Sequence, residues 1–395
     1  MRGMVKHSFR FLLFVAVLSV GFRLPAEDAN AGFSDGIDRN APDFVRVSVL
    51  RMGPGNELYS CVGHVAFRLE CPTFKLDSCY SYESEGAVNH LVRYFAGKLK
   101  MGMFNIPTEE FLETYRKDGR GVWQYALDLP PTVKQRLWRH MDDLVAKGAD
   151  VPYDYINRGC SKALLDCLRT AAAPAVVRGP ETDRTIREVF QSELQKDFPW
   201  NIFFILSFGG TESDALITGG TPRELMSFLA RATLEGRPIL VSDPVELVPR
   251  RSFAPASFFT PTVAAFLVLL LALAAVLFRL RVLTAAFLVV QAGLGCFFLY
   301  LVSVSELPTS CWNWLIVPFN PVMPALYVAL RGRWARVVRI GFAAVLLVWI
   351  AAFLVVPRAV ADPAHLVLAA AYAVLFCGAL LRLTVPCAHD IMFKF

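Results

Sequence analysis

The chain has 395 residues, of which 55% are hydrophobic, and its mean hydropathy is +0.44. These values exclude a single soluble domain of ordinary composition and favour a protein with membrane-spanning segments. The formal net charge of +6 comes largely from arginines that flank apolar runs, so we do not expect binding to nucleic acid.

The first residues have the pattern of an export signal. A basic segment, residues 2–10, precedes an apolar run over residues 11–22, and a small-x-small site follows at residues 29–31. Residues 1–31 are therefore predicted to be a signal peptide or an uncleaved N-terminal anchor. Either reading places the next segment outside the cytoplasm.

The exported segment, residues 33–250, mixes strand and helix signals. Alternating apolar and polar residues predict strands over residues 44–51, 61–69, 78–82 and 122–129, and antiparallel pairing is the simplest arrangement. Helical periodicity predicts helices over residues 91–99, 108–117, 131–147, 185–194 and 221–234. Residues 246–257 are predicted to be a linker. The mixture predicts an α+β domain.

Five of the nine cysteines precede residue 250, and an odd number in an oxidising compartment leaves at least one thiol unpaired. Cys160 and Cys167 are seven residues apart on one predicted helix, which separates them by roughly 10 Å and excludes a disulfide between them. Cys71 could pair with Cys79 across a hairpin, and Cys61 is an equally suitable partner.

Cys160 is the best candidate for a nucleophile. Turn-forming residues precede it and apolar residues repeat at helical spacing after it, so it lies where a loop becomes a helix. Unpaired backbone N–H groups and the helix dipole favour a thiolate at such a position. The alternative is a half-buried structural cysteine. His64, in the strand predicted over residues 61–69, is the candidate base, although a lone histidine on a strand is more often structural.

The C-terminal region, residues 258–395, contains five apolar runs that approach the length of a membrane span. They cover residues 260–278, 283–303, 312–330, 337–356 and 364–381. Five spans after an exported domain place the C-terminus in the cytoplasm. Most arginines of the loops then lie inside, in agreement with the positive-inside rule, whereas Arg250 and Arg251 lie outside and disagree. The sequence therefore predicts an all-α membrane domain of about five transmembrane helices.

A cysteine at a helix start with a histidine on a neighbouring strand resembles papain-like folds. In this chain the histidine precedes the cysteine. That order is similar to circularly permuted members of the NlpC/LRAT-like type, such as lecithin:retinol acyltransferase, which moves acyl groups through a thioester. The resemblance implies a permuted papain-like domain.

A closer resemblance, to the Lnb N-terminal periplasmic domain, covers nearly all of residues 45–235. The stretch GNELYSCVGHVAFR resembles that family's "GDELYSRFGHTALRV" motif, and YDYINRGC aligns without gaps to its "YDFFYDNC". Three further segments resemble its "FARGKLDY", "PW…GSPAD" and "TSxNWNL" motifs: residues 95–99, residues 199–200 with 209–214, and residues 309–315.

This resemblance implies a bacterial lipoprotein N-acyltransferase of the inner membrane, with several spans and a periplasmic catalytic domain. The acyl donor would be a membrane phospholipid and the acceptor the α-amine of a diacylglyceryl-cysteine lipoprotein. Neither a cofactor nor a metal is implied.

The resemblance also implies roles for single residues. Cys160 and His64 are the catalytic pair. Ser81 stands where the family has Asn on the third strand, which leaves Ser81, Tyr80 and Tyr82 as candidates to orient His64. Gly159 replaces the family's Asn before the nucleophile. Candidate substrate-binding residues from the shared motifs are Glu57, Tyr153, Asp154, Asn157, Asp214 and Asn313.

Two other functions use the same residues. A membrane-anchored cysteine peptidase or amidase, or a phospholipid acyl hydrolase, would need water in place of the amine. A peptidase needs a single anchor, so five spans with polar residues at their outer ends, such as Asn313, favour a lipid substrate. A non-catalytic envelope protein is the third reading, and the presence of both His64 and Cys160 disfavours it.

Overall fold

The computed structural model describes residues 37–55, 60–84, 90–148, 151–152, 154, 156–194, 208–240, 242–251, 260–317, 319–329, 335–355 and 363–384. Residues 1–39 and 40–395 form two compact units, and the second is described below. The predicted leader, residues 1–31, lies outside the described residues, as do Glu57, Tyr153 and the 199–200 motif.

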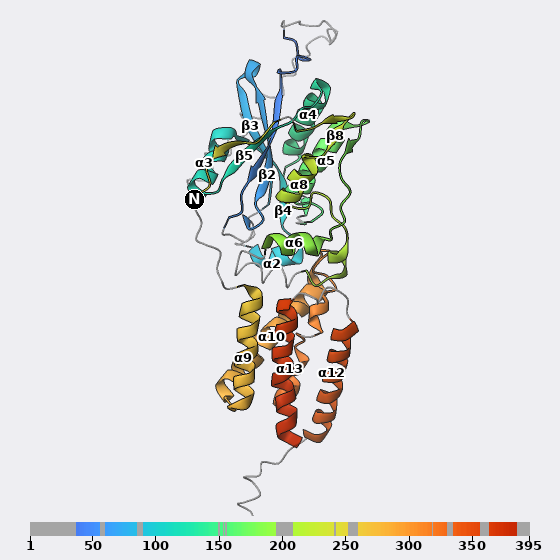
Figure 1. Cartoon of the computed structure of the whole chain (residues 1–395). Coiled ribbons are helices and arrows are strands. Elements are labelled where there is room, and N and C mark those ends of the chain that lie inside the picture. Colours follow the sequence, from blue (N-terminus) through green and yellow to red (C-terminus); the bar gives the residue numbers. More distant parts are fainter. Residues whose placement is uncertain are drawn as a thin grey trace, which may run out of the picture. The chain divides into compact units, whose positions relative to one another are not determined.

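The N-terminal part is built around a seven-stranded antiparallel sheet (Figure 1) with the order β10-β5-β1-β2-β3-β4-β6. The strands are β1 (Arg46–Met52), β2 (His64–Cys71), β3 (Leu76–Ser84), β4 (Lys100–Pro107), β5 (Val122–Ala126), β6 (Val151–Pro152) and β10 (Val245–Val248). β1, β2 and β3 form where strands were predicted, but they are buried along most of their length rather than at alternate residues. An α+β domain followed by C-terminal helices is therefore confirmed.

Helices cover both faces of this sheet (Figure 1). On one face, α3 (Thr108–Asp118) buries Phe111, Leu112 and Tyr115 in a cluster with Met52 and Ala66 of the strands. The other face carries α4 (Pro131–Lys147) and α5 (Cys160–Ala172), which pack against each other, and α5 also packs on β2 and β3. The sheet therefore separates α3 from the helix that begins at Cys160.

Several strands lie where the sequence did not predict them. No element was predicted for residues 100–107, which form β4 beside β3. The predicted linker over residues 246–257 includes the end of β10, which pairs with β5. The helix predicted over residues 221–234 ends earlier, as α8 (Pro222–Leu229), because β8 (Thr233–Leu234) and β9 (Arg237–Pro238) form a hairpin there with β7 (Val177–Arg178).

The described cysteines form no disulfide, so the pairing of Cys71 with Cys79 or Cys61 is not seen. For Cys71 and Cys79 the sheet register gives the reason. Cys79 pairs with Arg68, whereas Cys71 is an odd number of residues away from Arg68, so the two thiols lie on opposite faces. The sulfur of Cys79 instead lies 3.5 Å from Oγ1 of Thr108.

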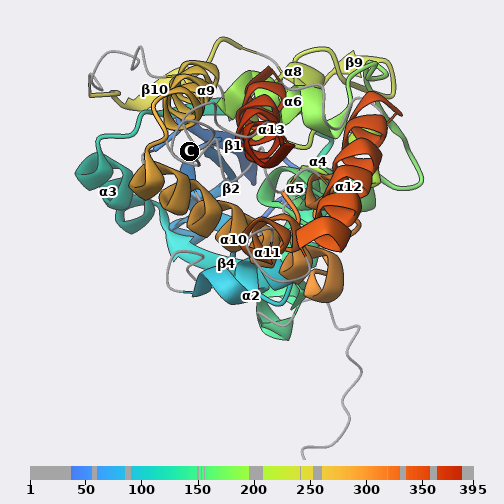
Figure 2. The same cartoon turned by 90° about the horizontal axis from the view of Figure 1, so that it is seen from below.

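The C-terminal part consists of helices α9 (Pro261–Leu277), α10 (Arg281–Val304), α11 (Val322–Ala329), α12 (Ala335–Val355) and α13 (Pro363–Thr384). Viewed end-on, α13 lies between α9 and α12, and α10 contacts both α9 and α11 (Figure 2). Within the described residues, α10 is the helix whose length and hydropathy suffice to cross a membrane. Pro261–Leu277 and Ala364–Ala379 are shorter apolar helices.

The third apolar run differs from the continuous helix predicted over residues 312–330. Only α11 and a short 3-10 helix, Trp314–Ile316, form within its described part. Pro321 and Pro324 disfavour an uninterrupted helix. The first backbone N–H groups of α11 have no carbonyl partner within a helix, and Asn320 supplies one. Its Oδ1 accepts from the N–H groups of Val322 and Met323 at 3.1 Å each.

Beside this non-helical stretch, α10 approaches very closely. A Cβ atom on Gly295 would lie 2.5 Å from the nitrogen of Pro321, so glycine is required there. One turn away, Nε2 of Gln291 donates to the carbonyl of Asn320 at 3.3 Å. Non-helical backbone is tolerated among apolar helices where protein groups satisfy it in this way.

The sheet domain is hydrogen-bonded to the end of α10 through α2 (Leu91–Ala96). Ser305 donates its hydroxyl to the carbonyl of Phe95 at 2.6 Å, and the N–H of Glu306 donates to the carbonyl of Ala96 at 3.0 Å. The hydroxyl of Tyr300 donates to the carbonyl of Val92 at 2.7 Å. We call this set of contacts the junction.

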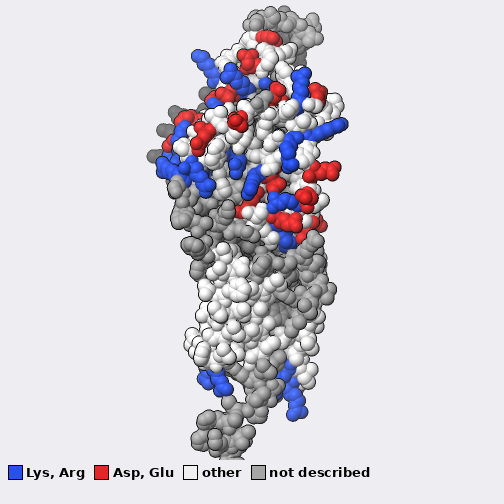
Figure 3. All heavy atoms as spheres, in the orientation of Figure 1, with Lys and Arg blue, Asp and Glu red and all other residues white. Residues whose placement is uncertain are grey.

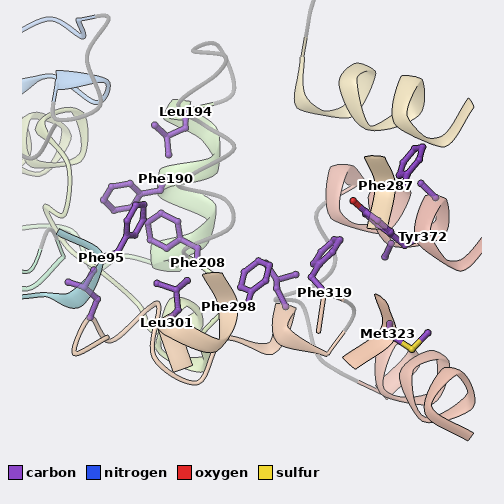
Figure 4. Close-up of a cluster of buried hydrophobic side chains, with 14 of the residues drawn as sticks. Phe95, Phe190, Leu194, Phe208, Phe287, Phe298, Leu301, Phe319, Met323 and Tyr372 are labelled. Carbon is purple, nitrogen blue, oxygen red and sulfur yellow. The ribbon is translucent and has the colours of Figure 1, made fainter. Parts of the chain in front are cut away.

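An apolar cluster continues through the junction (Figure 4). Phe95 of α2 meets Phe297 of α10 edge-on, with ring centroids 5.2 Å apart. Phe298 of α10 stacks on Phe319, with ring centroids 5.7 Å apart. One hydrophobic cluster therefore joins α2 to the C-terminal helices, and it is separate from the cluster between α3 and the sheet.

Charged side chains gather on the sheet domain, whereas the described surface of the helices is nearly free of them (Figure 3). The arginines described in the helical part lie at or beside helix ends: Arg279 and Arg281 between α9 and α10, and Arg336 and Arg339 in the first turns of α12. The apolar surface between these ends is consistent with contact to lipid.

Candidate active site

The loop before Cys160 is held by its own side chains. Oδ1 of Asp154 accepts from the N–H of Ile156, and its Oδ2 accepts from Nδ2 of Asn157, each at 2.9 Å. This Asx-turn leads into Gly159, the N-cap of α5, whose extended backbone carries no capping side chain. The sequence predicted Asp154 and Asn157 as substrate-binding residues; in the structure they shape the approach to the nucleophile.

Cys160 is the first residue of α5 and is half-buried. Backbone N–H groups of Val65, Ser161 and Cys160 itself lie close enough to its sulfur to lower the pKa of the thiol. Burial acts in the opposite direction, is the larger effect, and raises the pKa overall. The net shift is therefore opposite to the thiolate predicted from the sequence: the thiol is protonated at rest and needs a base.

His64 begins β2, immediately before Val65. Its Nε2 lies 2.8 Å from Oγ of Ser81, which fixes the ring and leaves Nδ1 as the other nitrogen for proton transfer. Burial, with a smaller contribution from the positive charge of Arg120, lowers the pKa of His64 to about 3. The imidazole is therefore neutral at physiological pH, and the same burial makes it a weaker base than a free histidine.

The strand geometry explains the bond between His64 and Ser81. Ser81 pairs with Ala66, two residues after His64, so both side chains project toward the face covered by α3. Tyr80 and Tyr82 flank Ser81 and project toward the other face, where the hydroxyl of Tyr80 donates to Asp142 of α4 at 2.6 Å. Of the three residues proposed to orient His64, Ser81 makes the hydrogen bond, and Tyr82 lies on the opposite face.

Gly63 has a strict conformational role. Its φ is +89°, and a Cβ atom there would lie 2.5 Å from the carbonyl oxygen of Met52. Met52 is also the cross-strand partner of His64. Glycine thus lets the chain enter β2 directly before the histidine.

We expect Ser81→Ala to reduce turnover roughly fivefold to tenfold, the value of one neutral hydrogen bond. Steady-state kinetics would measure this, and Ser81→Thr, which keeps the hydroxyl, is the matched control. An unchanged rate in Ser81→Ala would show that the ring of His64 is oriented by its packing alone.

The structure does not place Asp214 and Asn313 in contact with Cys160 or His64 among the contacts of the described residues. Oδ1 of Asp214 pairs with Nε of Arg187 at 3.1 Å, in the 3-10 helix Thr211–Asp214. Asn313 is buried, and its Oδ1 accepts from the N–H of Leu315 at 3.0 Å. Gly209 lies against Asn313 so closely that a Cβ atom on Gly209 would clash with it. Asn313 therefore contacts the N-terminal part at Gly209, whereas the ion pair of Asp214 lies within that part.

Sequence reasoning missed Arg120 and Tyr115. The guanidinium of Arg120 lies over the ring of Tyr115 at 4.8 Å, and its charge acts on the pKa of His64. Burial raises the pKa of Tyr115, and Cys160 is among the charges that act on it. The available signal was an arginine between Gly119 and Gly121, immediately before a buried strand.

Among the described residues, no group of three or more His, Cys, Asp or Glu side chains is arranged to hold a metal ion. The described site consists of a thiol, an imidazole, a hydroxyl and backbone donors. These are the parts used by enzymes that pass an acyl group through a cysteine.

The fold and the site thus define an α+β domain joined to a bundle of apolar helices. In this domain Cys160, at the start of a helix, lies close to the backbone of Val65, the residue that follows the strand histidine His64. Residues 34–192 match the family model of the Lnb N-terminal periplasmic domain. Residues 34–192 therefore form a domain of this family, which supports an Lnb-type assignment. Comparisons with curated proteins and with solved structures gave no match. The family match and α10 together indicate a membrane-associated protein with a periplasmic domain.

Proposed function

We propose that the chain is a lipoprotein N-acyltransferase, which moves an acyl chain from a membrane phospholipid to the α-amine of a diacylglyceryl-cysteine. The observation that carries this proposal is the half-buried Cys160 at the start of α5, next to the strand that presents a neutral His64 held by Ser81. The match of residues 34–192 to the Lnb periplasmic domain supports it. We further propose a permuted papain-like arrangement, because the histidine strand precedes the cysteine helix.

In the first half-reaction, Nδ1 of His64 takes the proton of Cys160 while Sγ attacks an ester carbonyl of the phospholipid. The oxyanion of the tetrahedral intermediate is stabilised by backbone N–H groups around the start of α5, including those of Cys160 and Ser161. The ester C–O bond then breaks, and His64 returns the proton to the leaving lysophospholipid alcohol. An acyl thioester remains on Cys160.

In the second half-reaction, the α-amine of the lipoprotein attacks the thioester carbonyl. His64 accepts a proton from the attacking amine and gives it to the sulfur as the C–S bond breaks. The products are an amide on the lipoprotein and the free thiol of Cys160. Water in place of the amine would make the same site a hydrolase.

The proposal includes five membrane crossings, with the sheet domain in the periplasm. The crossings are α9, α10, the segment containing α11, α12 and α13. The placement of Arg279, Arg281, Arg336 and Arg339 beside the ends of α9, α10 and α12 supports a common cytoplasmic side.

This topology predicts that a reporter fused after Phe395 is active only if the reporter functions in the cytoplasm. A fusion after Thr260, before α9, should show periplasmic activity and serves as the control. Periplasmic activity of the fusion after Phe395 would contradict the five crossings and would require one crossing fewer.

The proposed function is tested by the masses of lipoprotein N-terminal peptides from cells with and without the gene. We expect peptides with an N-linked acyl chain only when the gene is present. Unmodified lipoproteins, with free fatty acid released from phospholipid, would identify a hydrolase, and cleavage of cell-wall peptides would identify a peptidase or amidase.

A further inference from the structure

Arg120 is a buried cation whose charge is only partly compensated. The residue is 5% exposed, and its Nε donates to the carbonyl of Gly53 at 2.9 Å. One face of the guanidinium lies over the ring of Tyr115, 4.8 Å from the ring centroid. These contacts fix the guanidinium in one position.

One terminal nitrogen of this guanidinium, Nη2, is buried and has no hydrogen-bond partner within the described part of the chain. Nor does a carboxylate there form an ion pair with Arg120, whereas Arg68, on the same sheet, pairs with Asp77 at 2.7 Å. A buried, uncompensated charge is costly and is normally retained where it has an anionic partner.

The position of Arg120 connects it with the catalytic pair. Gly53, whose carbonyl it holds, follows Met52, the cross-strand partner of His64. Tyr115, on which it stacks, belongs to the cluster of α3 that covers the face carrying His64. The charge of Arg120 also contributes to the low pKa of His64, which agrees with this proximity.

We propose that Arg120 binds the phosphate of the acyl donor, with its unpaired terminal nitrogen donating to a phosphate oxygen. This inference rests on the proposed function and identifies the part of the substrate that this chain recognises. In a glycerophospholipid, only glycerol carbons and their oxygens separate the phosphate from the ester carbonyls. A guanidinium fixed beside the catalytic pair would therefore place an ester near Cys160. Guanidinium groups bind phosphate oxygens well because of charge and planar geometry.

The test compares three acyl donors by the rate at which Cys160 gains an acyl mass in the full-length, detergent-solubilised protein. The donors are dioleoyl phosphatidylglycerol, dioleoylglycerol, which has the same esters but no phosphate, and p-nitrophenyl decanoate, an activated neutral ester. We expect the wild-type protein to prefer the phospholipid over dioleoylglycerol by roughly ten- to a hundredfold, as for a charge-assisted hydrogen bond.

In Arg120→Gln this preference should fall to within a few-fold, while acylation by p-nitrophenyl decanoate continues. Arg120→Lys keeps the charge without the planar geometry and should retain an intermediate preference for the phospholipid. If Arg120→Gln does not fold, the preference of Arg120→Lys tests the role of Arg120. Arg51→Gln is the matched control. Arg51 also lies over an aromatic ring, that of Trp123, and has a buried nitrogen without a hydrogen-bond partner within the described residues. The hydrogen bond to Gly53 and the stacking on Tyr115 are made by Arg120.

Equal use of both lipids by the wild-type protein would overturn the role of Arg120 and leave the proposed function intact. An equal loss with all three donors in Arg120→Gln would also overturn it and identify a structural role or one exerted through His64. Acylation of the wild-type protein by p-nitrophenyl decanoate but by neither lipid would contradict the proposed function itself.

Discussion

Cys160→Ala should abolish the covalent acyl adduct and lower acyl transfer by roughly three orders of magnitude or more, as expected for loss of a nucleophile. With phospholipid and no amine acceptor, the wild-type protein should gain one acyl mass on the peptide containing Cys160. Neutral hydroxylamine should remove that mass, because it cleaves thioesters. Addition of a diacylglyceryl-cysteine peptide should discharge the adduct and give a triacylated peptide.

Cys160→Ser tests the chemistry rather than the presence of a side chain. A serine hydroxyl has a far higher pKa than a thiol, so we expect neither an adduct nor efficient transfer. Cys167→Ser, on the same helix, is the control and should retain the adduct. A triacylated product made at the normal rate by Cys160→Ala would rule out the covalent route.

His64→Ala should reduce turnover by roughly two to four orders of magnitude, the usual contribution of a general base. His90→Ala and His140→Ala should stay within a few-fold of wild type, because these histidines lie at the N-cap of α2 and on α4. Turnover of each variant against one phospholipid measures the effect. Equal losses in all three would indicate a folding defect or a wrong assignment of the base.

The same pair predicts an unusual pH profile. An unperturbed histidine loses its basic form below about pH 6.5, whereas the pKa of His64 is lowered to about 3. The acidic limb of kcat/KM should therefore lie well below pH 6. The raised pKa of Cys160 predicts slow alkylation at neutral pH that increases as the pH rises. Rapid alkylation at pH 6 would instead indicate a thiolate–imidazolium pair.

Local patterns were sufficient for the parts of the fold that alternate or repeat regularly. The position of Cys160 at a helix start followed from turn formers before it and helical spacing after it, and α5 begins at that residue. The strands predicted over residues 44–51 and 61–69 form as β1 and β2, although both are buried along most of their length rather than at alternate residues. Both signals depend on short stretches of chain, so no knowledge of distant contacts was needed.

Other features depend on contacts between distant segments. The bond of His64 to Ser81, and the separation of Tyr82 from it, follow from the register between β2 and β3, which no single segment encodes. Arg120 was missed because its proposed role comes from a buried terminal nitrogen that has no hydrogen-bond partner among the described residues. Its burial is known only from the assembled sheet. The non-helical part of the third apolar run likewise depends on Gln291 of α10, which donates to the carbonyl of Asn320.

The junction has a consequence for how substrates are selected. Hydrogen bonds from Ser305 and Glu306 to α2, together with the shared hydrophobic cluster, connect the sheet domain to the end of α10. They oppose rotation of the sheet domain relative to α10. If α10 spans the bilayer, Cys160 works at a constant height above the acyl chains. A lipoprotein carries its diacylglyceryl group beside its α-amine, so its own lipid anchor sets the height of that amine. Lipoprotein substrates would then be selected by the depth of their lipid-anchored N-terminus in the membrane, and not by the sequence or size of the folded protein that follows it.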